Sequence, residues 1–406
     1  MTVRIVQPLL RVRGGADSGR VGFVELFYDL VFVFAITQLS HTLLAHLDLG
    51  GAWKTAFLLV AVWWSWIYTA WALNWLNPDS APVRLMLFAL MFTGLLMSAS
   101  IPDAFGARGL AFACAYTAMQ VGRTAFALWC MQREGSEGRR RNFQRILAWL
   151  ALSAGFWIAG GLQADGLRWA CWLVAMGLEL LGPLLRFRTP GLGATPISDW
   201  DVDGGHLAER CGLFVIIALG ESLLVTGATF AGEAWSVDRF PAFATAVLAS
   251  IAMWWIYFDT GAVRGHHRIA HADDPGRVAR VAYTYLHLLI VAGILVSAVG
   301  DELVLAHPGH ATDAGIAAIL GGPVVYLLGV GLFKWVTNSR RWPPASHLAG
   351  LLAFAAVAPA AFAHAFGALE LAILSTAILV VVAVWENIAL RAGTAGRPAT
   401  QDGSAP

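Results

Sequence analysis

The sequence from Val24 to His41 reads VELFYDLVFVFAITQLSH. A run of this length and apolar content is typical of a helix that enters a membrane. It nevertheless contains two carboxylates, an amide and an imidazole, at Glu25, Asp29, Gln38 and His41. Ionisable groups in hydrocarbon are costly and usually face a protein interior or a water-filled cavity. We therefore expect this helix to do more than anchor the chain.

The composition of the whole chain agrees with that first helix. Hydrophobic residues make up 58% and charged residues 13% of the 406 residues, and the mean hydropathy is +0.65. Soluble domains carry roughly 25% charged residues, so this chain has about half of the usual charge. Apolar runs of about 20 residues, separated by short polar breaks, predict transmembrane helices. The chain is predicted to be an all-α integral membrane protein, with the lipid bilayer as its partner.

Twelve such runs follow one another along the chain. We expect spans at about 23–44, 53–76, 83–101, 109–131, 144–162, 169–187, 210–230, 241–260, 279–299, 314–335, 346–366 and 368–390. Gly367 is the one obvious break between the last two runs, so a helical hairpin is predicted there.

The basic residues are distributed unevenly over the predicted loops. With an even number of spans both termini share one side of the membrane, and that side holds 22 of the 27 Lys and Arg residues. Positive charge accumulates in cytoplasmic loops, so both termini are predicted to be cytoplasmic. Because the arginines follow the topology, the net charge of +1 gives no reason to expect a nucleic-acid partner.

The two halves of the predicted bundle resemble each other. Three matches occur in the same order: residues 209–218 with 25–34, Trp255-Ile256-Tyr257 with Trp66-Ile67-Tyr68, and Ser297-Ala298 before Asp301 with Ser98-Ala99 before Asp103. An even-numbered unit keeps its orientation when duplicated, so the matches predict two parallel six-helix repeats; chance similarity between apolar helices is the alternative. The predicted organisation is a basic tail (1–22), a first repeat (23–187), a linker (188–207), a second repeat (208–390) and a disordered tail (391–406).

Glu25 and Asp29 are four residues apart, on one helical face with about 6 Å of rise between them. Two carboxylates so close cannot both ionise comfortably in low dielectric, so one stays protonated, or a cation compensates them, or an arginine does. One hypothesis is a proton- or cation-binding pair. The alternative is that both lie in the first turn near the interface, where acidic residues favour a helix N-terminus.

Two further charged residues fall well inside predicted spans. Arg123 is in the fourth span, and a buried arginine needs a carboxylate or several carbonyls. We expect a structural ion pair ahead of contact with an anionic substrate, and the candidate partners are Glu25, Asp29, Glu179 and Glu221. Glu221 is in the middle of the seventh span beside Gly220, which lets another backbone or a ligand come close. We rank Glu221 as the best single functional candidate.

The remaining candidates carry weaker signals. Glu209 and Arg210 join the pathway candidates, and the secondary candidates are His41, His206, Asp259 and His287. Each polar residue alone is more often a satisfied contact between helices than a site. Residues 266–274 contain several His and Asp residues, but their spacing fits no metal motif, and no nucleotide-binding or catalytic motif is found. We predict no metal site, no cofactor and no catalytic residue.

The opening stretch resembles the first-helix signature of the bacterial low temperature requirement A family. Residues 206–214 with Leu219-Gly220-Glu221-Ser222 resemble a second signature, as do residues 254–258, and residues 287–302 are similar to a third region. The resemblance covers about residues 20–390 and implies a multi-pass protein of the bacterial inner membrane. The family name refers to growth in the cold and not to a biochemical activity.

The leading functional hypothesis is a transporter or channel for a small solute or ion, with proton coupling as one option. Its pathway would be lined or supported by Glu25, Asp29, Arg123, Glu209, Arg210 and Glu221. The alternatives are a membrane-embedded enzyme or lipid factor in cold adaptation of the envelope, and a non-transporting sensor or scaffold; of these classes an enzyme is not favoured. A pore predicts acids along a continuous polar path between the repeats, whereas a lipid enzyme predicts a side-opening cleft with clustered His and acidic groups.

Overall fold

The computed structural model describes residues 7–11, 20–196, 202–232, 239–259, 280–338 and 342–395. Within these ranges the chain forms twelve α-helices and no strand. The first six are α1 (Phe23–Ala45), α2 (Leu49–Leu73), α3 (Ala81–Ser100), α4 (Gly109–Glu134), α5 (Glu137–Gly161) and α6 (Asp165–Leu184). The other six are α7 (Gly204–Gly232), α8 (Phe240–Tyr257), α11 (His287–Ala306), α12 (Asp313–Asn338), α13 (Ala345–Phe362) and α14 (Ala368–Ala395). A 3-10 turn, η1 (Ile101–Asp103), follows α3, and a π-helix, η4 (Arg280–Leu286), leads into α11. The segment 266–274 lies outside the described residues.

The predicted spans are confirmed as helices. Each of the twelve coincides with one α-helix, and the ends differ by at most about two turns. Eleven of the described helices are long and apolar enough to cross a membrane. The twelfth, α4, is more polar because its buried residues include Gln120, Arg123 and Thr124. The break near Gly367 is also confirmed, since it lies between α13 and α14. The chain is therefore a multi-pass helical membrane protein.

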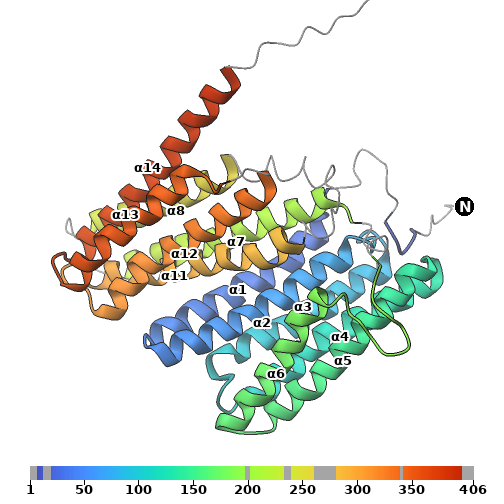
Figure 1. Ribbon diagram of the computed structural model, residues 1–406. Helices are drawn as coiled ribbons and strands as arrows, with labels where there is room; N and C mark the ends of the chain where they lie inside the picture. Colours follow the sequence, from blue (N-terminus) through green and yellow to red (C-terminus); the bar gives the residue numbers. More distant parts are fainter. Residues whose placement is uncertain are drawn as a thin grey trace, which may run out of the picture.

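The helices form two groups that lie side by side (Figure 1). One group contains α1–α6, drawn in blue to green, and the other contains α7, α8 and α11–α14, drawn in yellow-green to red. Across the boundary, α1 and α2 each contact both α7 and α11. These four helices therefore form much of the boundary between the halves, and η4 adds hydrogen bonds from Trp63 and Trp71 to Thr284.

The two groups share a pattern of neighbours. In the first, α1 contacts α2 and α3, and then α3, α4, α5 and α6 follow as successive neighbours. In the second, α7 contacts α8 and α11, and then α11, α12, α13 and α14 follow in the same way. The second group has additional contacts of α14 with α8 and α12. A duplicated six-helix unit would produce the shared part of this pattern, and the duplication itself stays a prediction.

Burial differs sharply between the boundary helices. The apolar segment of α2 is 89% buried, the highest value among the spans, whereas that of α1 is 50% buried. The α2 residues Trp63, Trp64 and Trp66 are at most 1% exposed. A helix that is apolar on every side can be stable only when it is enclosed by other helices or by lipid. α2 is enclosed by protein, while α1 has one face open to lipid, with Phe27 and Leu30 more than half exposed.

The crossing of α11 with α12 depends on glycines. A Cβ atom on Gly293 would lie 2.4 Å from the backbone nitrogen of Tyr326, and one on Gly322 would lie 2.5 Å from Ser297 Oγ. No Cβ atom fits at such distances, so both positions need glycine for this close approach. Small residues let membrane helices come into backbone contact. The crossing therefore presses Ser297 of α11 directly against α12.

Candidate functional site

The first buried polar cluster joins the N-terminal ends of α1 and α7. We call it the arginine network, and it consists of Arg11, Glu25, Asp29, His206 and Arg210. Glu25 Oε2 accepts hydrogen bonds from Arg11 Nη2 at 2.8 Å and from the Gly22 amide at 2.7 Å. Glu25 Oε1 lies 2.9 Å from His206 Nε2 and 3.4 Å from Arg210 Nη1. Glu25 thus has the first-turn role that one alternative expected, and it also connects α1 to α7.

Asp29 forms the second contact point of the network. Asp29 Oδ1 accepts hydrogen bonds from Arg210 Nη2 and from Trp66 Nε1, both at 2.7 Å. The Arg210 guanidinium carbon is 5.6 Å from the centroid of the Trp66 ring, within cation–π range. Asp29 and Arg210 are both 0% exposed. Charge-assisted hydrogen bonds of this length are among the strong ones, so three helices are fastened at one point.

Helical spacing and helix capping explain why these groups meet. Glu25 and Asp29 are four residues apart on α1, and His206 and Arg210 are four apart on α7, so each pair shares one helix face. Asp203 Oδ1 accepts from the amides of residues 205 and 206 and so fixes the start of α7. The Asn74 side chain at the end of α2 bonds both the amide and the carbonyl of residue 203.

The arginine network is balanced in charge. Two carboxylates face the guanidiniums of Arg11 and Arg210, and His206 is a further donor or acceptor according to its tautomer. The sequence left three ways to compensate the Glu25–Asp29 pair, and the structure uses arginines. Burying charges stabilises a fold only when each charge is paired and hydrogen-bonded. Among the described residues, Asp29 Oδ2, Arg210 Nε and His206 Nδ1 are buried atoms without a partner.

The second buried polar cluster lies further along the same helices. We call it the acid cluster, and it consists of Glu221 of α7 and Glu302 of α11 with Thr37 and His41 of α1. Glu221 is 3% exposed and faces Thr37 and His41. Glu302 is half-buried, within electrostatic range of both Glu221 and His41. Glu221 Oε1 and Glu302 Oε2 are buried without a hydrogen-bond partner, and no ion pair joins either acid to another described residue.

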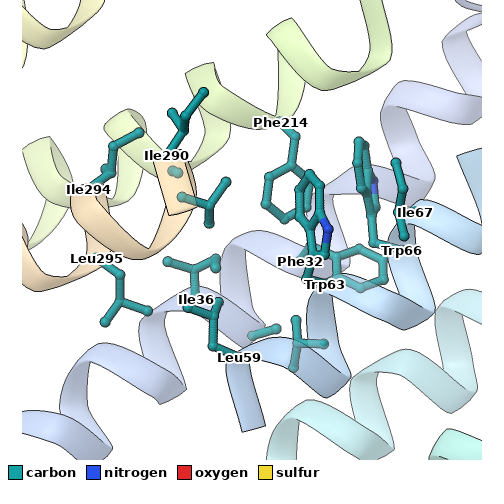
Figure 2. Packing of buried hydrophobic residues seen from close by; sticks show 14 of the residues in the cluster. Phe32, Ile36, Leu59, Trp63, Trp66, Ile67, Phe214, Ile290, Ile294 and Leu295 are labelled. Carbon is teal, nitrogen blue, oxygen red and sulfur yellow. The ribbon is translucent and has the colours of Figure 1, made fainter. Parts of the chain in front are cut away.

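An apolar layer separates the two clusters. Figure 2 shows Phe32 and Ile36 of α1, Trp63 and Trp66 of α2, and Phe214 of α7 packed together, with side chains of α11 next to them. The ring centroid of Phe214 lies 4.3 Å from that of Trp66 and 6.1 Å from that of Phe32. Asp29 and Thr37 are eight residues apart, which corresponds to about 12 Å along a helix. The polar groups therefore do not form a continuous path, and this layer closes the space between the clusters.

Comparison with known proteins places this chain in a family. A family model described as bacterial low temperature requirement A protein (LtrA) matches residues 20–384. The chain belongs to the LtrA family. An uncharacterized protein of Rhizobium meliloti (strain 1021) is 43% identical over 383 residues, which cover 92% of this chain and 91% of that protein. No solved structure matches the chain. In this LtrA family member, the two signatures seen in the sequence supply the two sides of the arginine network.

The expectation of an ion pair for Arg123 is wrong. Arg123 Nη2 donates to Gln120 Oε1 at 2.6 Å, and Nη1 lies 3.2 Å from both the Ser65 carbonyl and Thr69 Oγ1. No carboxylate of the described chain lies within ion-pair distance of it. The Gln120 side-chain amide lies between Arg123 and Glu179, because its Nε2 donates to Glu179 Oε2 at 2.7 Å. Neutral acceptors thus hold this buried cation, and it belongs to the packing of the first half.

Glu179 shows how fully such a buried group can be satisfied. Besides Gln120, its two carboxylate oxygens accept from Tyr116 Oη at 2.5 Å, Ser153 Oγ at 2.6 Å and Trp157 Nε1 at 2.9 Å. Four donors fill the hydrogen-bonding capacity of the two carboxylate oxygens. We assign Glu179 and Arg123 a structural role within α4, α5 and α6.

Three other candidates lie outside both clusters. Glu209 is exposed although it is next to Arg210, because consecutive residues point to different sides of a helix. Asp259 is exposed at the end of α8 and accepts from Asn387 Nδ2 at 2.7 Å. His287 has both ring nitrogens engaged, at 2.8 Å from Tyr257 Oη and from the Ala282 carbonyl of η4. His287 thus connects helices of the second half.

Sequence reasoning missed several residues that build the clusters. Arg11 and Trp66 bond the two acids of α1, yet the sequence places Arg11 in a basic tail and Trp66 only in a repeat match. Glu302 appeared only as part of a family region. The carboxylate spacing on α1 carried a signal, because two uncompensated acids require cations from elsewhere. Nothing local in the sequence could show which cations those are.

Proposed function

We propose that this LtrA family protein is a transporter or channel for a small cationic species, with its pathway at the boundary between α1, α2, α7 and α11. The observation that carries the proposal is the acid cluster. Glu221 and Glu302 come from two different helices that are long and apolar enough to cross a membrane, and neither acid has an ion-pair partner among the described residues. Uncompensated acids at membrane depth are costly, and they mark ion or proton pathways.

The arrangement of the two clusters supports an occluded state of such a pathway. The acid cluster would receive the ion or proton at one end, and the aromatic side chains of Phe32, Trp66 and Phe214 would bar its passage. On the far side, the Asp29 carboxylate is held by Arg210. Passage would require the apolar layer to part and the Arg210 bond to Asp29 to be exchanged for another partner. A relative movement of α1 against α7 and α11 would do both.

The finer assignments of topology and biology belong to this proposal. We propose two parallel six-helix repeats, both termini in the cytoplasm of a bacterial cell, and a role in growth at low temperature. The unequal placement of Lys and Arg supports the orientation, and the neighbour pattern shared by α1–α6 and α7–α14 supports the duplication.

A membrane enzyme is less well supported. The groove of about 500 Å³ between α3 and α4 is lined by apolar residues and Arg123, and the groove of about 320 Å³ between α8 and α14 is lined by apolar residues and Asn387. Neither of these two grooves has a histidine or an acid in its lining. The clustered His and acidic groups that a lipid enzyme needs are therefore missing from both.

Flux through proteoliposomes tests the proposal. Vesicles containing the wild-type chain should take up protons or a monovalent cation along an imposed gradient. Glu221→Gln removes the more buried acid of the acid cluster and should lower this flux by at least roughly tenfold, the scale of a lost charged partner. Glu209→Gln is the matched control, because it changes an exposed glutamate of the same helix and should leave the flux unchanged.

The proposal fails if neither protons nor monovalent cations move and if Glu221→Gln leaves growth in the cold unchanged. Equal flux in the Glu221→Gln and Glu209→Gln variants would also contradict it, because the acid cluster would then have no part in transport.

A further inference from the structure

A small polar cavity lies inside the second half, away from the boundary between the halves. Its volume is about 20 Å³, and it is enclosed by α8, α11, α12 and α14. A cavity needs roughly 10–15 Å³ to accept one water-sized occupant. Its polar lining comes from two helices, with Ser297 and Asp301 on α11 and Ser375 and Thr376 on α14. The space therefore suits a single small occupant that the oxygen atoms of these two helices contact, while the rest of the lining is apolar.

Two of these oxygen atoms have no partner in the protein. Ser297 is 5% exposed and lines the cavity, and its Oγ atom makes no hydrogen bond. Asp301 Oδ2 is also buried and unpaired, and no ion pair joins Asp301 to another described residue. Buried polar atoms are nearly always hydrogen-bonded, so each such exception asks for an explanation. An occupant of the cavity would satisfy both atoms.

A proline inside α12 supplies a further oxygen at the same place. Pro323 has no amide hydrogen, so the carbonyl of Ile319, four residues earlier, loses its usual helical donor. Both residues line the cavity. The Ser375 hydroxyl of α14 donates to that carbonyl at 3.3 Å. In many transporter folds, backbone carbonyls that lack a helical donor coordinate Na⁺, and the Ile319 carbonyl lacks its helical donor in the same way.

The first half of the chain offers an internal comparison. There the matching residues Ser98 and Asp103 are satisfied by their own backbone. Ser98 Oγ donates to the Gly94 carbonyl at 2.8 Å, and Asp103 Oδ2 accepts from the Ala107 amide at 3.0 Å. The same residue types thus have local partners in one half and lack them in the other. Residue type alone therefore does not explain why Ser297 Oγ and Asp301 Oδ2 are unpaired.

We propose that this cavity is a binding site for a dehydrated monovalent cation of the size of Na⁺. The oxygens of Asp301, Ser297, Ser375, Thr376 and Ile319 form a hard donor set that suits such an ion. One carboxylate neutralises one positive charge, whereas divalent sites recruit more acids, and no group of three or more His, Cys, Asp or Glu residues that could hold a metal occurs among the described residues. The inference goes beyond the proposed function, because the ion would bind whether or not the chain transports it.

Equilibrium binding of radioactive sodium to the purified full-length chain in nanodiscs tests this site. Saturable binding is expected, with lithium competing well and potassium poorly, because the cavity is small. Asp301→Asn should weaken binding roughly a hundredfold, and Ser297→Ala or Ser375→Ala should weaken it roughly tenfold, as expected for donors to a charged ligand. Asp103→Asn is the matched control and should bind sodium like the wild type.

Each outcome decides the proposal. The absence of saturable sodium binding by the wild type, or equal binding by the Asp301→Asn and Asp103→Asn variants, would overturn it. Gel-filtration profiles establish which variants are folded. If the Asp301→Asn variant is not folded, sodium binding by the Ser375→Ala variant provides the test. If the chain binds sodium but moves no ion, the proposed function is refuted and this site stands. If the chain moves ions but does not bind sodium, this site is refuted and the proposed function stands.

Discussion

The arginine network and the acid cluster share the helices α1 and α7, yet their charges are arranged in opposite ways. In the network, Glu25 and Asp29 face Arg11 and Arg210 at hydrogen-bond distance. In the acid cluster, Glu221 of α7 and Glu302 of α11 lie within electrostatic range of each other, and the basic side chain near both acids is the exposed His41 of α1. The first arrangement fastens helices together. The second leaves a deficit of positive charge that a mobile ion can fill.

The difference shows that replacing a buried charged residue has different consequences in the two clusters. Breaking a buried ion pair by removing one partner is strongly destabilising, because the other charge is left uncompensated. Neutralising an acid that has no partner removes a cost instead. Stability and transport should therefore respond in opposite ways to changes in the two clusters, and four substitutions can break or sharpen that contrast.

The largest loss of stability is expected for Arg210→Met. It would leave Asp29 fully buried with Trp66 as its remaining hydrogen-bond donor, and should cost about 3–5 kcal/mol. The measurement is thermal unfolding of the purified chain in detergent. The double variant Arg210→Met with Asp29→Asn should regain part of the loss, since no uncompensated charge remains on Asp29. If the Arg210→Met single variant is as stable as the wild type, the arginine network does not fasten the helices.

A smaller loss is expected for Trp66→Phe. This change removes the indole donor to Asp29 Oδ1 and keeps an aromatic ring beside Arg210 and Phe214. A hydrogen bond to a charged group contributes about 1.5–3 kcal/mol. The control is Trp64→Phe, because the Trp64 indole nitrogen has no partner among the described residues. Equal losses in the two variants would assign the effect to ring volume and not to Asp29.

Asp203→Ala should cost about 1 kcal/mol, because it removes the cap from the first turn of α7. The same unfolding assay detects it, and Asp203→Asn should recover most of the loss since asparagine also caps helices. A loss as large as that of Arg210→Met would mean that the start of α7, and not the buried ion pair, holds the network together.

The smallest change in stability is expected for Glu221→Gln. The acid has no ion-pair partner among the described residues, so neutralising it should shift the free energy of unfolding by less than about 1 kcal/mol. Its flux should nevertheless fall as proposed above. A marked destabilisation together with normal flux would reverse the roles assigned to the two clusters.

Much of the fold could be predicted because the membrane imposes it. Residues 109–131 were expected to be helical even with Arg123 inside them, and α4 begins at the expected residue. Within hydrocarbon every backbone group must be satisfied inside its own segment, so apolar runs of sufficient length become helices whatever their neighbours are. The candidate site was predictable only in part. Glu25, Asp29, His206 and Arg210 were singled out one by one, but their mutual contacts were not.

The failures have a common physical cause. Arg123 was expected to need a carboxylate, and instead a glutamine and two oxygens of α2 accept its hydrogen bonds. Glu209 and Arg210 are neighbours in sequence, yet one faces outward and the other is completely buried. Which side of a helix faces protein depends on the packing of all the other helices. A single helix that is apolar nearly all round gives little indication of it.

The sequence by itself determined the class of the protein, the approximate positions of the described helices, and which polar residues within them had to be explained. It could do so because burial in lipid acts on each segment separately. Only the tertiary structure decided that Arg210 and Arg11 compensate the acids of α1, that Glu221 and Glu302 are left without a cation, and that Ser297 and Asp301 have no local partner although Ser98 and Asp103 do. Those outcomes depend on contacts between residues that are far apart in sequence, and such contacts exist only once the helices have packed.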